Sequence, residues 1–289
     1  MQKFAIRNLN QTKMSKNVFL KLREFIYEKS GIFFPEGKLY LLESRLSKRL
    51  IELEIDSFEQ YLYHIRKQIS PTEELAAIYN LITINETFFF RFEKQLDLFI
   101  NKLLPEVREK KAAKHDRRIN IWSSASSSGE ELYTIAMLLK EKMAQKLFTT
   151  NLRLHGTDIS ARILKKAKLG QYGSNSFRSN MDNYYKTKYF TNEDGVFSVK
   201  DEIKRMVSFD YTNLNDVSAI RKQRSLDFLF CRNVLIYFDK EMKKRVIRAF
   251  YDILNHGGYL FLGEAESLHG ISSAFKVVHF PGVFVYWKE

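Results

Sequence analysis

The stretch from Ile119 to Leu139 reads INIWSSASSSGEELYTIAMLL, and it most constrains how this chain can fold. It begins with a short apolar strand pattern, passes through small residues that end at Gly129, and continues with the apolar spacing of a helix. A loop of Ser and Ala that closes on Gly lets the backbone approach a ligand, and the amides of the following helix point into the same space. The stretch therefore predicts a nucleotide-binding strand, loop and helix.

Two acidic residues, Glu130 and Glu131, follow this loop in the first turn of the expected helix. Each could simply cap the helix, or it could contact a ligand. Two carboxylates at the mouth of the loop disfavour a polyphosphate and favour a cationic or zwitterionic nucleoside. The phosphate-loop pattern GxxxxGK[ST] and the GxGxxG fingerprint are both absent.

From Ile119 to the end of the chain, apolar strand patterns alternate with helical ones. Strands are expected at 119–123, 152–158, 206–209, 226–231 and 259–262, helices at 130–139, 160–169 and 240–254, and a closing hairpin at 275–279 and 283–287. Residues 119–289 thus predict an α/β fold, a doubly wound Rossmann-like sheet with an antiparallel edge hairpin. A lapse in the alternation and an apparent EDG turn predict a small inserted lobe at about 180–203.

Residues 17–83 show only helical spacing and predict a small all-helical domain that follows a mobile leader of residues 1–16. Helices are expected near 18–26, 39–53, 57–69 and 72–81. On the second of these, Arg45, Lys48 and Arg49 lie off the apolar stripe. This pattern predicts a basic outer face, which is either simply solvated or a docking surface for an acidic partner.

Residues 84–118 are expected to connect the two domains and to carry a cofactor-contact motif. Asn85, Thr87 and Arg91 stand beside an aromatic run that predicts a buried plug between the domains. Polar side chains buried beside Phe need partners, which a ligand could supply. Pro105 is expected to end a helix, and the charged run from Arg108 to Arg118 is expected to form an exposed connection.

The chain has 289 residues, a formal net charge of +13 and one cysteine, Cys231. No segment approaches 18 consecutive apolar residues and no signal-peptide pattern begins the chain, so a cytoplasmic protein without membrane insertion is expected. The basic residues are scattered and not gathered in one motif, which disfavours nucleic acid as the partner. An acidic protein partner would explain the positive charge as well. Six dispersed histidines and the lack of a GxSxG elbow predict neither a metal site nor an activated nucleophile.

Polar residues follow the strands of the expected sheet at the points where those strands end. Loop 123–130 follows the first strand, Asp158 ends the second, Asn213 and Leu214 follow the third, and Arg232 and Asn233 follow the fourth. Ligands of open α/β sheets bind at these carboxyl ends. Asp158 is therefore expected to accept the ribose hydroxyls, with a helix N-cap as its alternative role. Asn233 could instead be a structural Asn at a strand end.

Six ordered strings resemble the CheR-type chemotaxis receptor methyltransferases, which are protein-glutamate methyltransferases. They are NETFFFR (85–91), IWSSASSSGEELY (121–133), GTDIS (156–160), FDYTNL (209–214), FCRNVLIYFD (230–239) and GGYLFLGEAESL (257–268). The segment GIFFPEGKLYLLESRL resembles the N-terminal domain of that family. The resemblance extends from about residue 17 to the C-terminus.

This resemblance implies S-adenosyl-L-methionine as the methyl donor and S-adenosyl-L-homocysteine as the product. The implied acceptors are glutamate side chains on the cytoplasmic helical bundle of a chemotaxis receptor, which would become methyl esters. The implied cofactor contacts, matched position by position, are Asn85, Thr87, Arg91, Glu130, Asp158, Asn213, Leu214, Arg232 and Asn233. Arg91 and Tyr237 would face the transferred methyl group and the acceptor carboxylate.

The chemistry of the residues is compatible with this implied reaction. A glutamate carboxylate has a pKa of about 4.3, so it is already a nucleophile at neutral pH and needs no general base. The chain differs from the family's usual pattern in three places. The loop has Ala125 or its neighbour Ser124, and Ser126, where the family usually has Gly and Cys; Glu264 and Ala265 replace a common His-Ser pair; and the inserted lobe at about 180–203 looks short. A regulatory module that binds the cofactor without transferring methyl groups is the alternative. A nucleic-acid methyltransferase is disfavoured, because CRNVLIYF lacks the Asn/Asp-Pro-Pro-aromatic signature.

Overall fold

The structure is a computed structural model that describes residues 13–67, 72–147, 149–178 and 181–289. It divides into two compact units, residues 1–84 and residues 85–289.

Helices are the regular elements of the N-terminal unit among its described residues, as predicted. Its elements are α1 (Lys16–Ser30), the 3-10 turn η2 (Glu36–Lys38), α2 (Leu39–Glu52), α3 (Phe58–Lys67) and α4 (Thr72–Ile82). Ser15 caps α1 by accepting a hydrogen bond from the amide of Val18, and Gly31 ends the helix at φ 73°. Residues 1–12 of the predicted leader lie outside the described residues.

The basic residues of α2 do not form the predicted outer face. Arg49 pairs with Glu74, which is 3% exposed, at 2.6 Å between Nη2 and Oε2, and Tyr61 donates to Glu74 Oε1 at 2.6 Å. Burial alone would raise the pKa of Glu74, but the hydrogen bonds from Arg49 and Tyr61 lower it. Arg45 donates to the carbonyl of Ile82. The prediction is therefore wrong for Arg45 and Arg49, whereas Lys48 is exposed.

The C-terminal unit is built on a seven-stranded sheet with the order β6-β2-β1-β7-β8-β10-β9. Its strands are β1 (Arg118–Ser123), β2 (Asn151–Asp158), β6 (Val207–Tyr211), β7 (Leu226–Cys231), β8 (Leu254–Leu262), β9 (Lys276–Phe280) and β10 (Val283–Trp287). The first five strands in the order pair in parallel, and β10 pairs antiparallel with both β8 and β9. The predicted doubly wound sheet with an antiparallel edge hairpin is confirmed.

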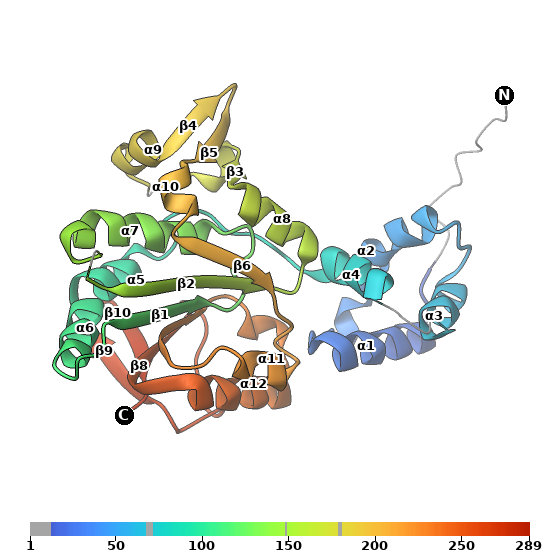
Figure 1. Cartoon of the computed structure of the whole chain (residues 1–289). Helices are drawn as coiled ribbons and strands as arrows, with labels where there is room; N and C mark the ends of the chain where they lie inside the picture. The colour runs from blue at the N-terminus through green and yellow to red at the C-terminus, as the bar shows by residue number, and fades with distance from the viewer. Residues whose placement is uncertain (1–12, 68–71, 148, 179–180) are drawn as a thin grey trace. The chain divides into compact units, whose positions relative to one another are not determined.

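Helices cover both faces of this sheet (Figure 1). One face carries α5 (Glu93–Leu98), the π-helical η3 (Phe99–Leu103), α6 (Leu104–Ala112), α7 (Glu130–Leu147) and α8 (Ala161–Leu169), and the other carries α11 (Val217–Arg221) and α12 (Lys240–Ile253). Phe99 packs edge-on against Phe228 and Phe230, whereas Trp122 packs against Phe250 of α12 on the opposite face. Every residue of β7 is therefore buried, as its apolar run predicted.

Pro105 does not end a helix, contrary to the prediction. It lies at the start of α6, and the helical run continues from Glu93 to Ala112 through the π-helical segment η3. Proline has no N–H group to donate, so it interrupts the hydrogen-bond pattern of an α-helix, and the π-helical segment η3 lies directly before this interruption. Residues 108–112, predicted as part of an exposed connection, are consequently helical.

Two residues of the aromatic run, Phe89 and Phe90, belong to the core of the C-terminal unit itself. Phe89 is fully buried in the hydrophobic core of the C-terminal unit, with ring contacts at 4.9 Å to Tyr172, 5.2 Å to Phe177 and 5.0 Å to Phe190. Phe90 lies in the same core. The run joins the segment that begins at Asn85 to the unit that contains the sheet.

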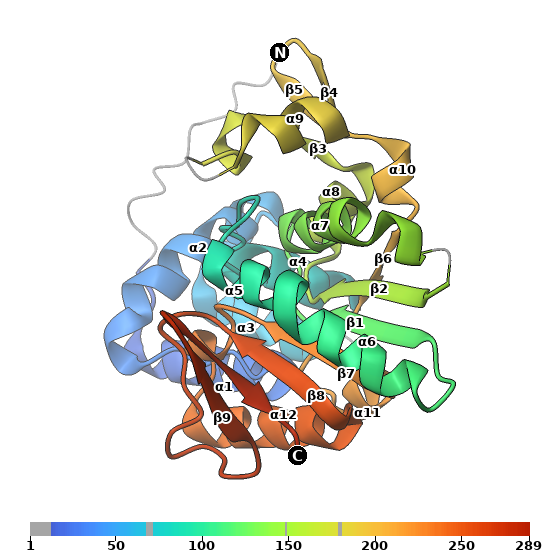
Figure 2. The same cartoon turned by 90° about the vertical axis from the view of Figure 1, so that its left-hand side faces the viewer.

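An inserted lobe lies between α8 and β6, as predicted, although it begins earlier (Figure 2). It contains β3 (Gln171–Tyr172), η4 (Ser174–Ser176), α9 (Asn183–Tyr189), β4 (Phe190–Glu193), β5 (Val196–Val199) and α10 (Asp201–Lys204), with the strand order β3-β5-β4. Asp194 and Gly195 both have positive φ, 50° and 82°, which suits the tight turn of a hairpin. The lobe is fastened to α7, where Glu141 accepts from Tyr184 and pairs with Lys188.

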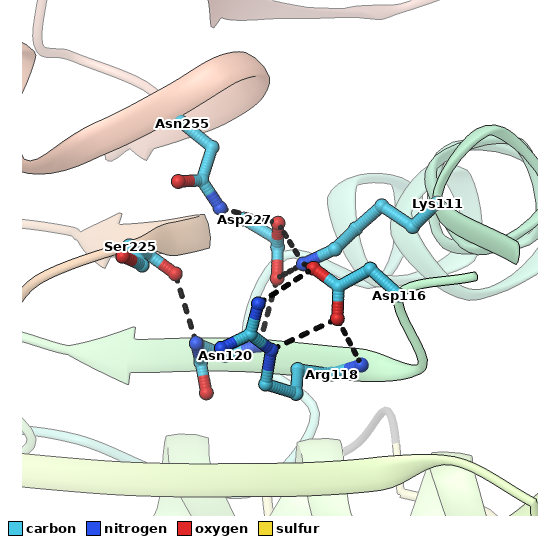
Figure 3. Close-up of polar contacts among 7 residues, drawn as sticks. All are labelled: Lys111, Asp116, Arg118, Asn120, Ser225, Asp227 and Asn255. Atoms are coloured by element: carbon cyan, nitrogen blue, oxygen red, sulfur yellow. Dashed lines mark hydrogen bonds and ion pairs between the residues drawn. The ribbon is translucent and has the colours of Figure 1, made fainter. Parts of the chain in front are cut away.

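A buried carboxylate holds the amino ends of the central strands together (Figure 3). Asp227 of β7 is 2% exposed and pairs with Lys111 of α6 at 2.8 Å. It also accepts from the backbone amide of Asn120 at 2.9 Å and from the side chain of Asn255 at 2.8 Å. Both of its oxygens are satisfied, so the charge is buried without an unpaired group.

We predict that Glu74→Gln weakens the N-terminal unit by about 3 kcal/mol, because the half-buried Arg49 guanidinium loses its buried carboxylate and keeps only the exposed Glu52. Hydrogen exchange followed by mass spectrometry should show faster exchange across α2 and α4. The exposed Lys48→Gln on the same helix is the control and should exchange as the parent protein does. Equal protection in the two variants would show that the pair contributes nothing.

Candidate functional site

The predicted site forms where the parallel strands end. The backbone amide of Ser127, in the loop after β1, donates to Asp158 Oδ2 at 3.0 Å, and the Ser127 hydroxyl donates to the carbonyl of Asn85 at 3.1 Å. The amide of Thr212, after β6, donates to the carbonyl of Asp158 at 3.2 Å. Segments that follow three different strands, together with Asn85, are thus brought to one edge of the sheet.

Asp158 is 6% exposed, and burial raises its pKa to about 6, although hydrogen bonds from backbone amides act in the opposite direction. Its Oδ1 accepts from the amide of Ser160 at 2.9 Å. The N-cap of α8 is Ser160, whose hydroxyl accepts from Ile163, so capping is not the main role of Asp158. A carboxylate oxygen accepts more than one hydrogen bond, which leaves both oxygens with capacity for ligand hydroxyls.

The serine-rich loop satisfies its own hydroxyl groups. Five serine hydroxyls donate to protein acceptors: Ser123 to Glu131, Ser124 to the Phe230 carbonyl, Ser126 to the Thr157 carbonyl, Ser127 to the Asn85 carbonyl and Ser128 to Glu130. These bonds tie the loop to β2, to β7 and to the segment at Asn85. The serines therefore shape the loop and do not depend on a ligand for their partners.

Two glycines permit the close packing of this loop. Gly129 has φ 95°, a conformation that side chains disfavour. A Cβ on Gly156 would lie 2.8 Å from the ring of Phe209 and 2.9 Å from Ser126 Oγ. A side chain on Gly156 would push the loop away from β2, and one on Gly129 would crowd Phe209 and Ala167.

Arg232 is a buried cation of the site, with 9% of its surface exposed. Its Nη2 donates to the carbonyl of Arg91 at 2.5 Å, its Nε lies 3.2 Å from Glu131 Oε2, and its guanidinium stands over the ring of Phe92 at 4.8 Å. Burial lowers the pKa of Arg232, and the charge of Glu131 opposes that shift. Ser123 donates to the second oxygen of Glu131 at 2.7 Å and orients it.

Three buried polar atoms just after β7 have no hydrogen-bond partner among the described residues: Arg232 Nε, Arg232 Nη1 and Asn233 Oδ1. Arg232 Nε still forms an ion pair with Glu131, so Arg232 Nη1 and Asn233 Oδ1 are the two atoms most in need of a partner. Leaving such atoms unpaired costs free energy, and native structures rarely do so unless a ligand or water supplies the partner. A zwitterionic ligand offers both a carboxylate for the guanidinium and an amino group for a carbonyl oxygen, so the orphaned atoms fit an amino-acid nucleoside.

The two glutamates in the first turn of α7, Glu130 and Glu131, have different partners. Glu130 is 1% exposed and accepts from Ser128 at 2.6 Å and from Ser176 of the lobe at 3.0 Å. Burial raises its pKa. Glu131, by contrast, pairs with Arg232. The sequence left a cap or a ligand contact open for both glutamates and, through the family resemblance, assigned Glu130 to the cofactor. The pairing of Glu131 with Arg232 was not predicted.

Arg91 lies between two aromatic rings. Its guanidinium is 5.6 Å from the ring centre of Phe88 and 5.2 Å from that of Phe92, and its Nη1 donates to the carbonyl of Glu86 at 3.2 Å. The guanidinium of Arg178, from the lobe, also lies over the Phe88 ring, 4.9 Å from its centre. The stacking limits the motion of Arg91, which remains half-buried and available to an anion.

The remaining predicted site residues lie on the same edge with differing surroundings. Asn213 accepts from the amide of Asn215 at 3.0 Å and so closes the turn after β6, while Leu214 is buried. Tyr237 belongs to the 3-10 helix η5 (Leu235–Tyr237), which directly follows Asn233 and Val234. Thr87 is half-buried in the segment that follows Asn85.

Comparison with known proteins identifies the family of the chain. The family model described as the CheR methyltransferase all-alpha domain matches residues 17–83, and the one described as the CheR methyltransferase SAM binding domain matches residues 85–284. The chain belongs to the CheR methyltransferase family.

Curated relatives agree with this assignment over nearly the whole chain. The chemotaxis protein methyltransferase 2 of Vibrio cholerae serotype O1 is 37% identical over 281 residues, which cover 97% of this chain and 96% of that protein. The chemotaxis protein methyltransferase of Borreliella burgdorferi is 35% identical over 270 residues, which cover 91% and 94%. As a CheR methyltransferase, the protein uses S-adenosylmethionine, the cofactor that the sequence predicted. Among the described residues, no helix is long and apolar enough to cross a membrane.

We predict that cofactor affinity falls as the pH drops below about 6. The ionised Asp158 accepts ribose hydroxyl groups, and protonation near its pKa of about 6 removes that acceptor, so affinity should fall by at most about tenfold per pH unit. Calorimetry with S-adenosylhomocysteine between pH 5 and 8 measures this. Asp158→Asn should bind more weakly and lose the dependence. A parent-like pH profile in Asp158→Asn would contradict the role.

Proposed function

We propose that this methyltransferase forms methyl esters on glutamate side chains of the cytoplasmic helical bundle of chemotaxis receptors. The observation that carries the proposal is Arg91, a guanidinium held between Phe88 and Phe92 beside the cofactor site. A stacked guanidinium is suited to bind a carboxylate through paired hydrogen bonds. The names of the curated relatives, chemotaxis protein methyltransferases, agree with a receptor as the acceptor.

The chain's own residues would hold the cofactor at the carboxyl edge of the sheet. Arg232 Nη1 would bind the carboxylate of the methionine part, Asn233 Oδ1 its amino group, and Asp158 the ribose hydroxyls. Asn85, Thr87, Asn213 and Leu214 would line the remaining surface. Glu130 would act indirectly, because its carboxylate supports the loop through Ser128. When bound, the cofactor supplies a methyl group on a positively charged sulfur.

The acceptor needs positioning more than activation. A glutamate carboxylate is ionised at neutral pH, so no residue has to remove a proton from it. Arg91 would align the carboxylate, and the Tyr237 hydroxyl would donate a further hydrogen bond. The rings of Phe88 and Phe92 would exclude water from the carboxylate, which makes it a stronger nucleophile.

We predict that Arg91→Ala and Tyr237→Ala each lower turnover at least about a hundredfold, because both remove alignment of the acceptor. Cofactor affinity should be partly retained, since Arg232, Asn233 and Asp158 remain. Transfer of labelled methyl and calorimetry with S-adenosylhomocysteine measure the two effects. Arg23→Ala removes a guanidinium that stacks on Phe19 and Phe33 in the N-terminal unit and serves as the control. Unchanged turnover in either site variant would refute its role.

The product should be an ester. After incubation with methyl-labelled S-adenosylmethionine and a receptor cytoplasmic fragment, mild alkali should release the label as volatile methanol, whereas methylated amines would keep it. Changing the receptor glutamates to alanine should abolish the volatile label. Alkali-stable label would contradict ester formation, and measurable cofactor binding without transfer to any receptor of a panel would favour a regulatory module.

A further inference from the structure

Glu266 is a buried carboxylate at the site that the proposed reaction does not use. It follows β8 and is 4% exposed, and no lysine, arginine or histidine nitrogen of the described residues pairs with it. A carboxylate buried without a cation must be stabilised by hydrogen-bond donors. Four backbone amides supply them: Gly263 at 2.8 Å and Asn233 at 2.7 Å to Oε2, and Val234 at 2.9 Å and Ile236 at 3.3 Å to Oε1.

These amides belong to two separate loops. Gly263 follows β8, and residues 233–236 follow the neighbouring parallel strand β7. Glu266 therefore clamps the loop after β7 onto the loop after β8. The clamped loop includes Asn233, which has the left-handed φ of 60°, and leads directly into η5 with Tyr237. Asparagine tolerates that conformation better than other non-glycine residues, and the hydrogen bond from the Asn233 amide to Glu266 helps to hold it.

The packing around the clamp leaves no room for adjustment. A Cβ on Gly263 would lie 2.8 Å from Glu266 Oε2 and 2.9 Å from both the backbone nitrogen and Nδ2 of Asn233. Gln95 of α5 adds a further tie by donating to the carbonyl of Leu262 at 2.8 Å. The position of Asn233 is thus determined by contacts on the side of the loop that faces β8.

We propose that Glu266 is a positioning residue for methyl transfer, which fixes the loop of residues 233–237 so that Asn233 meets the cofactor and Tyr237 meets the acceptor. The part that concerns Tyr237 rests on the proposed function, and the part that concerns Asn233 rests only on cofactor binding. Glu266 touches neither reactant itself. It acts through the backbone of the loop.

The carboxylate is required because it accepts four hydrogen bonds and donates none. In Glu266→Gln, one oxygen remains, and the new NH2 group faces two of the four amides donor to donor. The variant keeps the size of the side chain, so the change tests the hydrogen bonds and not the volume. The loop should then lose its fixed conformation.

The test compares two buried carboxylates of the same region in the full chain. Glu266→Gln should weaken S-adenosylhomocysteine binding at least about tenfold in calorimetry, the loss expected for a loop no longer held in place. Asp227→Asn, at the opposite end of β7, should lower the melting temperature but keep affinity within about twofold. Equal affinity of Glu266→Gln and the parent protein would overturn the proposal.

A double-mutant cycle separates positioning from general destabilisation. If Glu266 acts through Asn233, Glu266→Gln should cost little further affinity in an Asn233→Ala background, so the two losses should not add. Additive losses would contradict the proposal. Should Glu266→Gln fail to fold, Gly263→Ala, which forces the clamp apart, must show the same coupling to Asn233.

The same variants distinguish failure of this proposal from failure of the proposed function. If the parent protein methylates receptor glutamates, Glu266→Gln should lower kcat at saturating cofactor at least about tenfold through Tyr237. If the parent protein transfers no methyl to glutamate, the proposed function fails, while the coupling of Glu266 to Asn233 in cofactor binding still decides the positioning role. An unchanged kcat in an active protein would refute the link to Tyr237.

Discussion

The guanidinium of Arg232 lies almost completely buried at the end of β7, and the compensation of its charge organises the site. Burying an unpaired charge costs several kcal/mol, so partners have to be brought to it. They come from the Arg91 carbonyl, 141 residues away in sequence, from the carboxylate of Glu131 and from the ring of Phe92. The aromatic segment, the first turn of α7 and the end of β7 are therefore held against one another. One nitrogen of the guanidinium still lacks a protein partner, which suits an anionic group of the cofactor.

The central strand β7 shows how structure and function are divided along one element. Its six residues are all buried between helices on both faces. At its amino end, both carboxylate oxygens of Asp227 have partners, which are a lysine, a backbone amide and an asparagine, so no polar atom of Asp227 is left for a ligand. At its carboxyl end, Glu266 satisfies four amides and holds the loop, while Arg232 and Asn233 keep polar atoms unpaired. The hydrogen bonds of Asp227 stabilise the sheet, whereas the unpaired atoms of Arg232 and Asn233 can bind a ligand.

Sequence patterns predicted the architecture well and individual partners poorly. The two units, the sheet with its edge hairpin, and the position of the lobe followed from periodicity, because burial on one or two faces imposes a spacing on the residues of each element. Pro105 was misread, since proline at the start of a helix and proline after a helix look alike in the sequence. Arg45 and Arg49 were assigned to an exposed basic face, because their positions off the apolar stripe do not reveal that Glu74 and the Ile82 carbonyl lie within reach.

The sequence by itself determined the fold class, the family and the cofactor, and it predicted the edge of the sheet at which the site would lie. Motifs that end strands suffice for this, because parallel strands place their carboxyl ends together. Only the tertiary structure decided which polar group meets which. It directed Glu131 rather than Glu130 to Arg232, turned the loop serines onto neighbouring strands, and placed Glu266 under the loop of Asn233. The physical reason is that periodicity is local, whereas a hydrogen bond depends on distance and direction between segments that only the folded sheet brings together.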